Sequence, residues 1–127
     1  MAAKRKVLII DDEEINATAL SFILETNYDV KIEANSRLAI ETAENYVPDI
    51  ILCDILMPGM NGFDVLTKLK ESEVTKNIPV IFISGLYDDE EVKTIRSLGA
   101  VDLIAKPFEE AIVNEKLNKH LKKNTED

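Results

Sequence analysis

The stretch VLIIDD at residues 7–12 places two aspartates directly after four consecutive apolar residues. A short apolar run of this kind is typical of a strand that is covered on both faces in a parallel sheet. The same arrangement, an apolar run that leads into a polar residue, recurs at three places: Asp54 after 50–53, Ser84 after 80–83 and Lys106 after 103–105. Ligands of open α/β folds bind at the carboxyl ends of the strands. We therefore expect these polar side chains to face one pocket.

Apolar runs alternate with helix-like segments five times, which is the pattern of an α/β protein with a parallel sheet. Residues 28–33 alternate between apolar and polar, so this strand is expected at an edge of the sheet. The helix that follows it is expected to begin with Ser36 as its cap. The first helix is expected to turn one apolar stripe toward the sheet, made of Ala19, Leu20, Ile23 and Leu24.

Composition narrows the class of protein. At 127 residues the chain has the size of one domain, expected to span 1–127 with an ordered core at about 5–122. A net charge of −9 disfavours direct binding to nucleic acids, which depends on lysine and arginine. A single cysteine excludes an internal disulfide, and no apolar stretch is as long as a membrane span. We therefore expect a cytoplasmic protein whose acidic surface favours cations and basic patches on its partners.

The carboxylates at the expected sheet edge indicate a metal site. Three clustered carboxylates repel one another, and Mg²⁺ prefers a few carboxylate oxygens together with water and phosphate. The combination with a hydroxyl and an ammonium group suggests a switch based on an aspartyl phosphate. Structural alternatives exist for each residue: the aspartate pair as a helix cap, Asp54 as a buried structural residue, Ser84 as a cap and Lys106 as a solvated lysine.

With its spacing considered as a whole, the chain resembles the receiver domains of two-component response regulators over nearly its whole length. The matching motifs are Asp11-Asp12, Asp54 with Met57-Pro58 and Gly62, Ser84-Gly85, Gly99-Ala100 and Lys106-Pro107-Phe108. The resemblance implies a flavodoxin-like (βα)5 fold, a three-layer sandwich whose parallel sheet has the strand order 2-1-3-4-5.

The resemblance also implies a role for each residue of the site. Asp54 would be the phosphoacceptor. Mg²⁺ would be held by Asp54, by Asp12 directly, by Asp11 through a water molecule and by the backbone carbonyl of Leu56. Ser84 and Lys106 would hold phosphoryl oxygens, and a cis bond to Pro107 would set the direction of the lysine.

By the same resemblance, a histidine kinase or a histidine phosphotransfer protein would supply the phosphoryl group. The modified domain would then bind a downstream protein or a fused output domain through its fourth helix, fifth strand and fifth helix. Such a domain modifies only itself, so it is not expected to be an enzyme with an outside substrate. Many receivers carry an aromatic residue three positions before the lysine; Leu103 stands there in this chain, and a core leucine is expected instead of an aromatic switch.

Other functions share parts of this pattern. A phosphatase with an aspartate nucleophile needs a second aspartate two residues further on, where this chain has Leu56. Flavin binding is disfavoured because the phosphate loop after the first strand would be acidic. A receiver-like scaffold that never takes phosphate stays open as an alternative. Cys53 and His120 are both expected to be structural.

Two pairs of apolar residues are candidates for further roles. Ile15 and Phe22 lie off the main stripe of the first helix, where they either dock a kinase or fold under neighbouring loops. Leu56 and Leu86 each stand two positions after a site residue, where the resemblance implies that they flank the path of water to the phosphoryl group. They either gate hydrolysis, which gives a long-lived phosphorylated state, or turn away from the path.

Overall fold

The computed structural model describes residues 4–85 and 88–121. In these two ranges the strands are β1 (Arg5–Ile10), β2 (Tyr28–Glu33), β3 (Ile50–Asp54), β4 (Val80–Ser84) and β5 (Asp102–Ala105). The helices are α1 (Glu14–Leu24), α2 (Ala39–Tyr46), α3 (Gly62–Glu71), α4 (Asp89–Ser97) and α5 (Glu110–Leu121), and a 3₁₀ turn, η1 (Ser36–Leu38), precedes α2.

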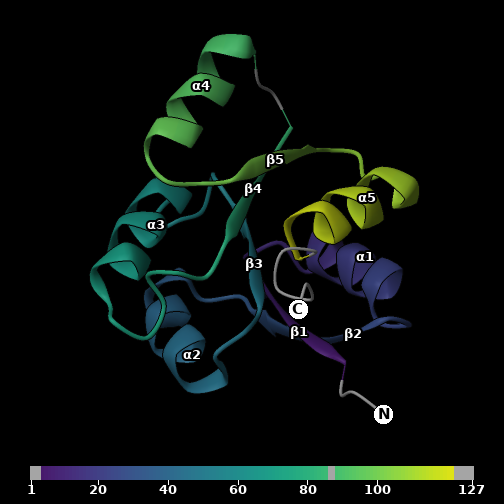
Figure 1. Cartoon of the computed structure of the whole chain (residues 1–127), viewed down its shortest axis with the longest axis horizontal. Helices are drawn as coiled ribbons and strands as arrows, with labels where there is room; N and C mark the ends of the chain where they lie inside the picture. Colours follow the sequence, from purple (N-terminus) through teal and green to yellow (C-terminus); the bar gives the residue numbers. More distant parts are fainter. Residues whose placement is uncertain (1–3, 86–87, 122–127) are drawn as a thin grey trace.

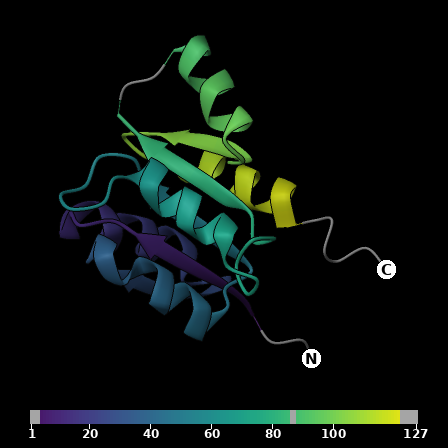
Figure 2. The same cartoon turned by 90° about the vertical axis from the view of Figure 1, so that its left-hand side faces the viewer.

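All five strands are parallel and lie in the order β2-β1-β3-β4-β5, as the resemblance implied. Helices α2 and α3 cover one face of the sheet and α1 and α5 the other, with α4 beside β5 (Figures 1 and 2). The chain thus forms the predicted three-layer sandwich. The apolar stretch at the end of β1 and all of β3 are buried, whereas every residue of β2 is at least partly exposed, as expected of an edge strand. The predicted alternation holds over 28–31 and fails at the end of the strand, where Ile32 is 41% exposed.

The ends of α4 depend on residues close to them in sequence. The Asp88 side chain accepts a hydrogen bond from the Glu91 N–H and so caps α4. Gly99 ends the same helix with a φ of 113°, a left-handed conformation that favours glycine. Residues with a helical period, among them Val65 and Leu69, are buried along α3.

Two local predictions were wrong. Ser36 does not cap the second helix: Asn35 caps η1 by accepting from the Arg37 N–H, and the Ser36 hydroxyl contacts another loop. In α1 the sheet-facing residues are Ala17, Leu20 and Leu24, with Ile23 partly buried, while Ala19 is exposed. The apolar residues of α1 allow more than one stripe, and packing on the sheet selects between them.

A buried charged cluster connects β5 to α5. Asp102 is 5% exposed, and its carboxylate oxygens lie 2.8 Å from Lys116 Nζ and 2.9 Å from His120 Nε2. Burial opposes its ionisation, but the hydrogen bonds from Lys116, His120 and the Leu103 N–H outweigh it and lower the pKa of Asp102 to about 2. His120 is therefore structural, as expected, and so is Cys53, which is fully buried in β3.

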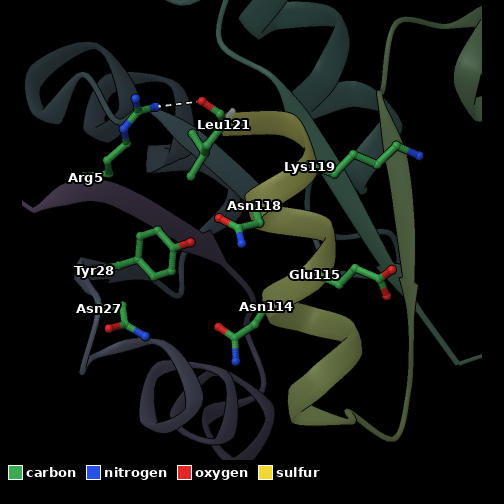
Figure 3. A pocket seen from close by; sticks show the side chains of 8 residues that line it. All are labelled: Arg5, Asn27, Tyr28, Asn114, Glu115, Asn118, Lys119 and Leu121. Carbon is green, nitrogen blue, oxygen red and sulfur yellow. Dashed lines mark hydrogen bonds between the residues drawn. The ribbon is translucent and has the colours of Figure 1, made fainter. Parts of the chain in front are cut away.

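The opposite edge of the sheet, where the strands begin, carries a cavity of about 580 Å³. Arg5 donates a hydrogen bond to the carbonyl oxygen of Leu121 over 3.1 Å and so connects the start of β1 to the end of α5. Figure 3 shows Asn114 and Asn118 pointing from α5 toward Tyr28 and Asn27. Within the described residues, none of the helices has the length and apolar composition that crossing a membrane requires.

Candidate functional site

The polar residues predicted at the sheet edge do meet there. Asp11 is fully buried and Asp54 is 2% exposed, because each stands at the end of a central strand. Asp11, Asp12 and Asp54 each offer a carboxylate oxygen, and these three oxygens lie within 4.8 Å of one another. Ser84 ends the neighbouring strand β4 and lines the same cleft. The structural alternative of a simple helix cap does not account for this convergence.

The two adjacent aspartates hold buried carboxylate oxygens. Asp11 Oδ1 accepts a hydrogen bond from the Glu13 N–H over 2.9 Å. Among the described residues, Asp11 Oδ2 and Asp12 Oδ1 are buried without a hydrogen-bond partner. Burial raises the pKa of Asp11 to about 6; the Glu13 N–H opposes this shift and the charge of Asp54 adds to it. Buried acceptor oxygens in a repelling cluster fit a hard divalent cation.

Lys106 lies beside Asp54. Its Nζ lies 3.4 Å from Asp54 Oδ2 and 3.5 Å from Oδ1, and the Lys106 N–H donates to the carbonyl oxygen of Ser84 over 3.0 Å. The bond between Lys106 and Pro107 is cis, as the resemblance implied. Glu13 Oε1 also lies 3.6 Å from Lys106 Nζ. Sequence reasoning missed Glu13, although its place directly after the aspartate pair was a usable signal.

The cleft between these residues has a volume of about 280 Å³ and is lined by Asp12, Glu13, Asp54, Leu56, Ser84 and Lys106, among others. The Leu56 side chain is 81% exposed and lies at its rim. Leu86, the other leucine predicted to flank the path of water, lies outside the described residues. The cleft is open to solvent and its lining includes charged side chains, so small charged groups can reach Asp54.

The two apolar residues singled out on α1 are exposed. Ile15 is 85% and Phe22 75% exposed, and together with Thr18 and Ala19 they line a shallow hollow on the outer face of the helix. The alternative that they fold under neighbouring loops is therefore wrong. We call Ile15, Thr18, Ala19 and Phe22 the α1 patch. Exposed apolar surface of this kind is typical of protein contacts.

Comparison with known proteins assigns this fold and acidic cleft to one class of signalling domain. Residues 7–118 match the response regulator receiver domain. The chain belongs to this family, the receiver modules of two-component signalling.

Individual relatives agree with this assignment. The chain is 36% identical over 117 residues to the chemotaxis protein CheY of Thermotoga maritima, covering 91% of this chain and 96% of that one. It is 37% identical over 110 residues to the response regulator PleD of Caulobacter vibrioides, covering 85% of this chain but 24% of PleD. Against a probable cyclic di-GMP phosphodiesterase of Vibrio cholerae, the 34% identical match spans 26% of the relative. The chain thus spans about a quarter of the length of several curated relatives.

Solved structures share the fold. A response regulator from Chloroflexus aurantiacus superposes with a TM-score of 0.87 at 27% identity, over 94% of this chain and 98% of that one. The chemotaxis protein CheY4 of Vibrio cholerae gives a TM-score of 0.86 at 26% identity, over 92% and 98% of the two chains.

Proposed function

We propose that this chain is a phosphorylation-dependent receiver that takes a phosphoryl group on Asp54 from a histidine kinase or a histidine phosphotransfer protein. The observation that carries the proposal is the position of Asp54, which is buried at the end of β3 close to both Lys106 and two further aspartates. Residues 1–127 would act as one domain in the cytoplasm, alone or within a longer protein.

In the proposed step, a carboxylate oxygen of Asp54 forms a bond to phosphorus while the bond from phosphorus to the donor imidazole breaks. The electron pair of the broken bond stays with the imidazole nitrogen. Charge develops on the phosphoryl oxygens, and the ammonium of Lys106 and the hydroxyl of Ser84 line the cleft where these oxygens would lie. Positioning and charge compensation supply most of the catalysis in such transfers.

Asp12, Asp54, the Leu56 carbonyl and, through water, Asp11 would hold a Mg²⁺ ion. The buried oxygens of Asp11 and Asp12, which find no hydrogen-bond partner in the described part of the chain, support this assignment. The ion would neutralise charge on the phosphoryl oxygens. Without it, the three carboxylates repel one another in a buried place, so metal binding is expected to stabilise the fold.

Incubation with a small acyl phosphate and Mg²⁺ tests the proposal directly. Intact-mass measurement should find one added phosphoryl group, and chelation of Mg²⁺ should prevent the addition. A wild-type chain that takes up no phosphoryl group would contradict the proposal. The rival phosphatase activity lacks its general acid, since Leu56 stands where the second aspartate is needed, and turnover of an outside phosphate ester is not expected.

The aspartates are expected to contribute unequally to Mg²⁺ affinity. Asp12→Ala should weaken binding by about tenfold or more, because it removes a direct ligand. Asp11→Ala should cost less, because one Asp11 oxygen already serves the Glu13 N–H and removal of a buried negative charge relieves repulsion. Lys106→Ala, the control, should leave affinity unchanged or raise it by removing a nearby positive charge. Calorimetric titration measures all four proteins, and equal losses for the two aspartate variants would contradict the assignment.

The α1 patch would dock the phosphohistidine donor. Phe22→Glu should slow transfer from a phosphotransfer protein by about tenfold, because it places a charge in an apolar contact. Phosphorylation by a small acyl phosphate should be unchanged, since the patch lies outside the cleft. Val74, which is 50% exposed after α3, provides a matched control as Val74→Glu. An equal effect of both variants on transfer would argue against docking at this patch.

Leu56 would limit hydrolysis of the phosphorylated state. Its exposed side chain stands at the rim of the cleft and cannot orient an attacking water. Leu56→Asn should therefore speed loss of the phosphoryl group severalfold after the donor is removed. Leu98, a half-exposed leucine at the end of α4, serves as the control in Leu98→Asn. Unchanged decay in the Leu56 variant would show that this leucine does not gate water.

A further inference from the structure

The loop between β3 and α3, residues 55–61, follows the phosphoacceptor directly and carries the Leu56 carbonyl. Its two ends are tied together, because the Gly62 N–H donates to the carbonyl oxygen of Ile55 over 2.7 Å. Asn61 and Asp64 form a reciprocal capping box that fixes the start of α3. Both ends of the loop, which together form its base, are therefore held in place.

The tip of the same loop is held from outside, by a residue that lies far away in sequence. Ser36 is 4% exposed in the turn η1. Its hydroxyl donates to the carbonyl oxygen of Pro58 over 2.9 Å and accepts from the Met60 N–H over 3.1 Å. A hydroxyl is suited to this double contact, because it carries one donor and two acceptor lone pairs.

The residue between these two contacts shows how closely the tip and η1 fit. Gly59 has a φ of 86°, and a Cβ built on it would lie 3.2 Å from both Ser36 Oγ and Arg37 Nε. The tip therefore turns in a left-handed conformation directly against η1. Leu56 stands between the base of the loop at Ile55 and this anchored tip.

We infer that Ser36 is a positioning residue for the phosphorylation site, which it serves by anchoring the tip of the loop that presents the Leu56 carbonyl to the cation. This inference rests on the proposed function. Because the base and the tip are both fixed, the peptide between them has little freedom to rotate. The Leu56 carbonyl is then oriented before the cation binds, so less conformational entropy of the loop is lost when it binds.

Ser36→Ala tests the inference. The variant removes both hydrogen bonds to the tip but no group of the cleft itself. Removal of a group that orients a metal ligand typically lowers the metal affinity tenfold or more. We therefore expect Ser36→Ala to bind Mg²⁺ about tenfold more weakly. Phosphorylation by a small acyl phosphate should be slow at limiting Mg²⁺ and approach the wild-type rate at saturating Mg²⁺. A role in stability alone would not produce this dependence on the metal concentration.

Thr75 offers a matched control. Its hydroxyl is fully buried and donates to the carbonyl oxygen of Leu69 over 2.7 Å, in the turn that precedes β4 and so at the far edge of the sheet. Thr75→Val removes one buried hydroxyl without touching the loop, so it should lower the melting temperature and leave Mg²⁺ affinity unchanged. Gly59→Ala is a second probe. It changes the loop instead of η1, by placing a methyl group against Ser36 and Arg37, and it should weaken Mg²⁺ binding even if Ser36→Ala folds poorly.

The possible outcomes separate the inference from the proposed function. Weaker Mg²⁺ binding in Ser36→Ala and Gly59→Ala, with Thr75→Val unchanged, supports the inference. Unchanged affinity in Ser36→Ala, in a background where the wild type binds Mg²⁺ and is phosphorylated, overturns the inference alone. Equal losses in Ser36→Ala and Thr75→Val would also overturn it, since general destabilisation would then explain both. A wild type that neither binds Mg²⁺ nor takes up phosphate removes the proposed function as well.

Discussion

Asp54→Asn is expected to abolish phosphorylation by a small acyl phosphate. The carboxamide has nearly the shape of the carboxylate, but it carries no negative charge and is not a competent nucleophile toward phosphorus. The neighbouring Lys106 keeps an ionic partner in Glu13 at 3.6 Å, so the cleft should retain its form. Intact-mass measurement should find one phosphoryl group on the wild type and none on the variant.

The same pair of proteins tests the route of the signal. In the wild type, phosphorylation should shift NMR signals of α4 and of β5, where Leu103 is 4% exposed in the core, by biasing an existing equilibrium of these elements. Asp54→Asn, treated in the same way, should show no such shifts. Equal labelling of the variant would contradict the choice of Asp54, and wild-type shifts confined to the cleft would contradict the proposed output face.

Gly62→Ala is expected to destabilise the protein by about 1–3 kcal/mol or more, as overpacked sites do. A Cβ at this position would lie 2.6 Å from the carbonyl oxygen of Asp54 and 2.8 Å from the Cα of Ile55. Both are backbone atoms, so neither can swing aside as a flexible side chain would. Alanine favours helices over glycine by at most about 1 kcal/mol, which does not offset this clash. Urea denaturation would measure the loss.

Gly85→Ala provides the control for this substitution. Gly85 is exposed, and a Cβ built there meets no atom of the described residues within 4 Å. Gly85→Ala should change the free energy of unfolding by no more than about 0.5 kcal/mol, as is usual for substitutions at the surface. Similar stabilities of the two variants would mean that the backbone beside Asp54 yields more easily than the contacts imply. Because Gly62 packs against the peptide of the phosphoacceptor, its alanine variant should also lower the phosphorylation rate.

Much of the fold followed from patterns that depend only on residues close together in sequence. Continuous apolar runs such as 50–53 predicted central strands, and the alternation in 28–33 predicted the edge strand. The cap at Asp88 and the left-handed Gly99 also depend on local sequence, since both act on their own helix. Ser36 was mispredicted because its hydroxyl binds backbone groups 22 and 24 positions away, which no local pattern encodes.

The sequence by itself determined the class of fold and the residues of the acidic cleft other than Glu13, because parallel strands bring their carboxyl ends to one edge whatever the details of packing. Only the tertiary structure decided which stripe of α1 faces the sheet and left Phe22 exposed. It also decided that Glu13 reaches Lys106, and that Asp102 pairs with residues 14 and 18 positions away. These contacts depend on distances between separate elements, and such distances are set by the packed core rather than by the order of residues along the chain.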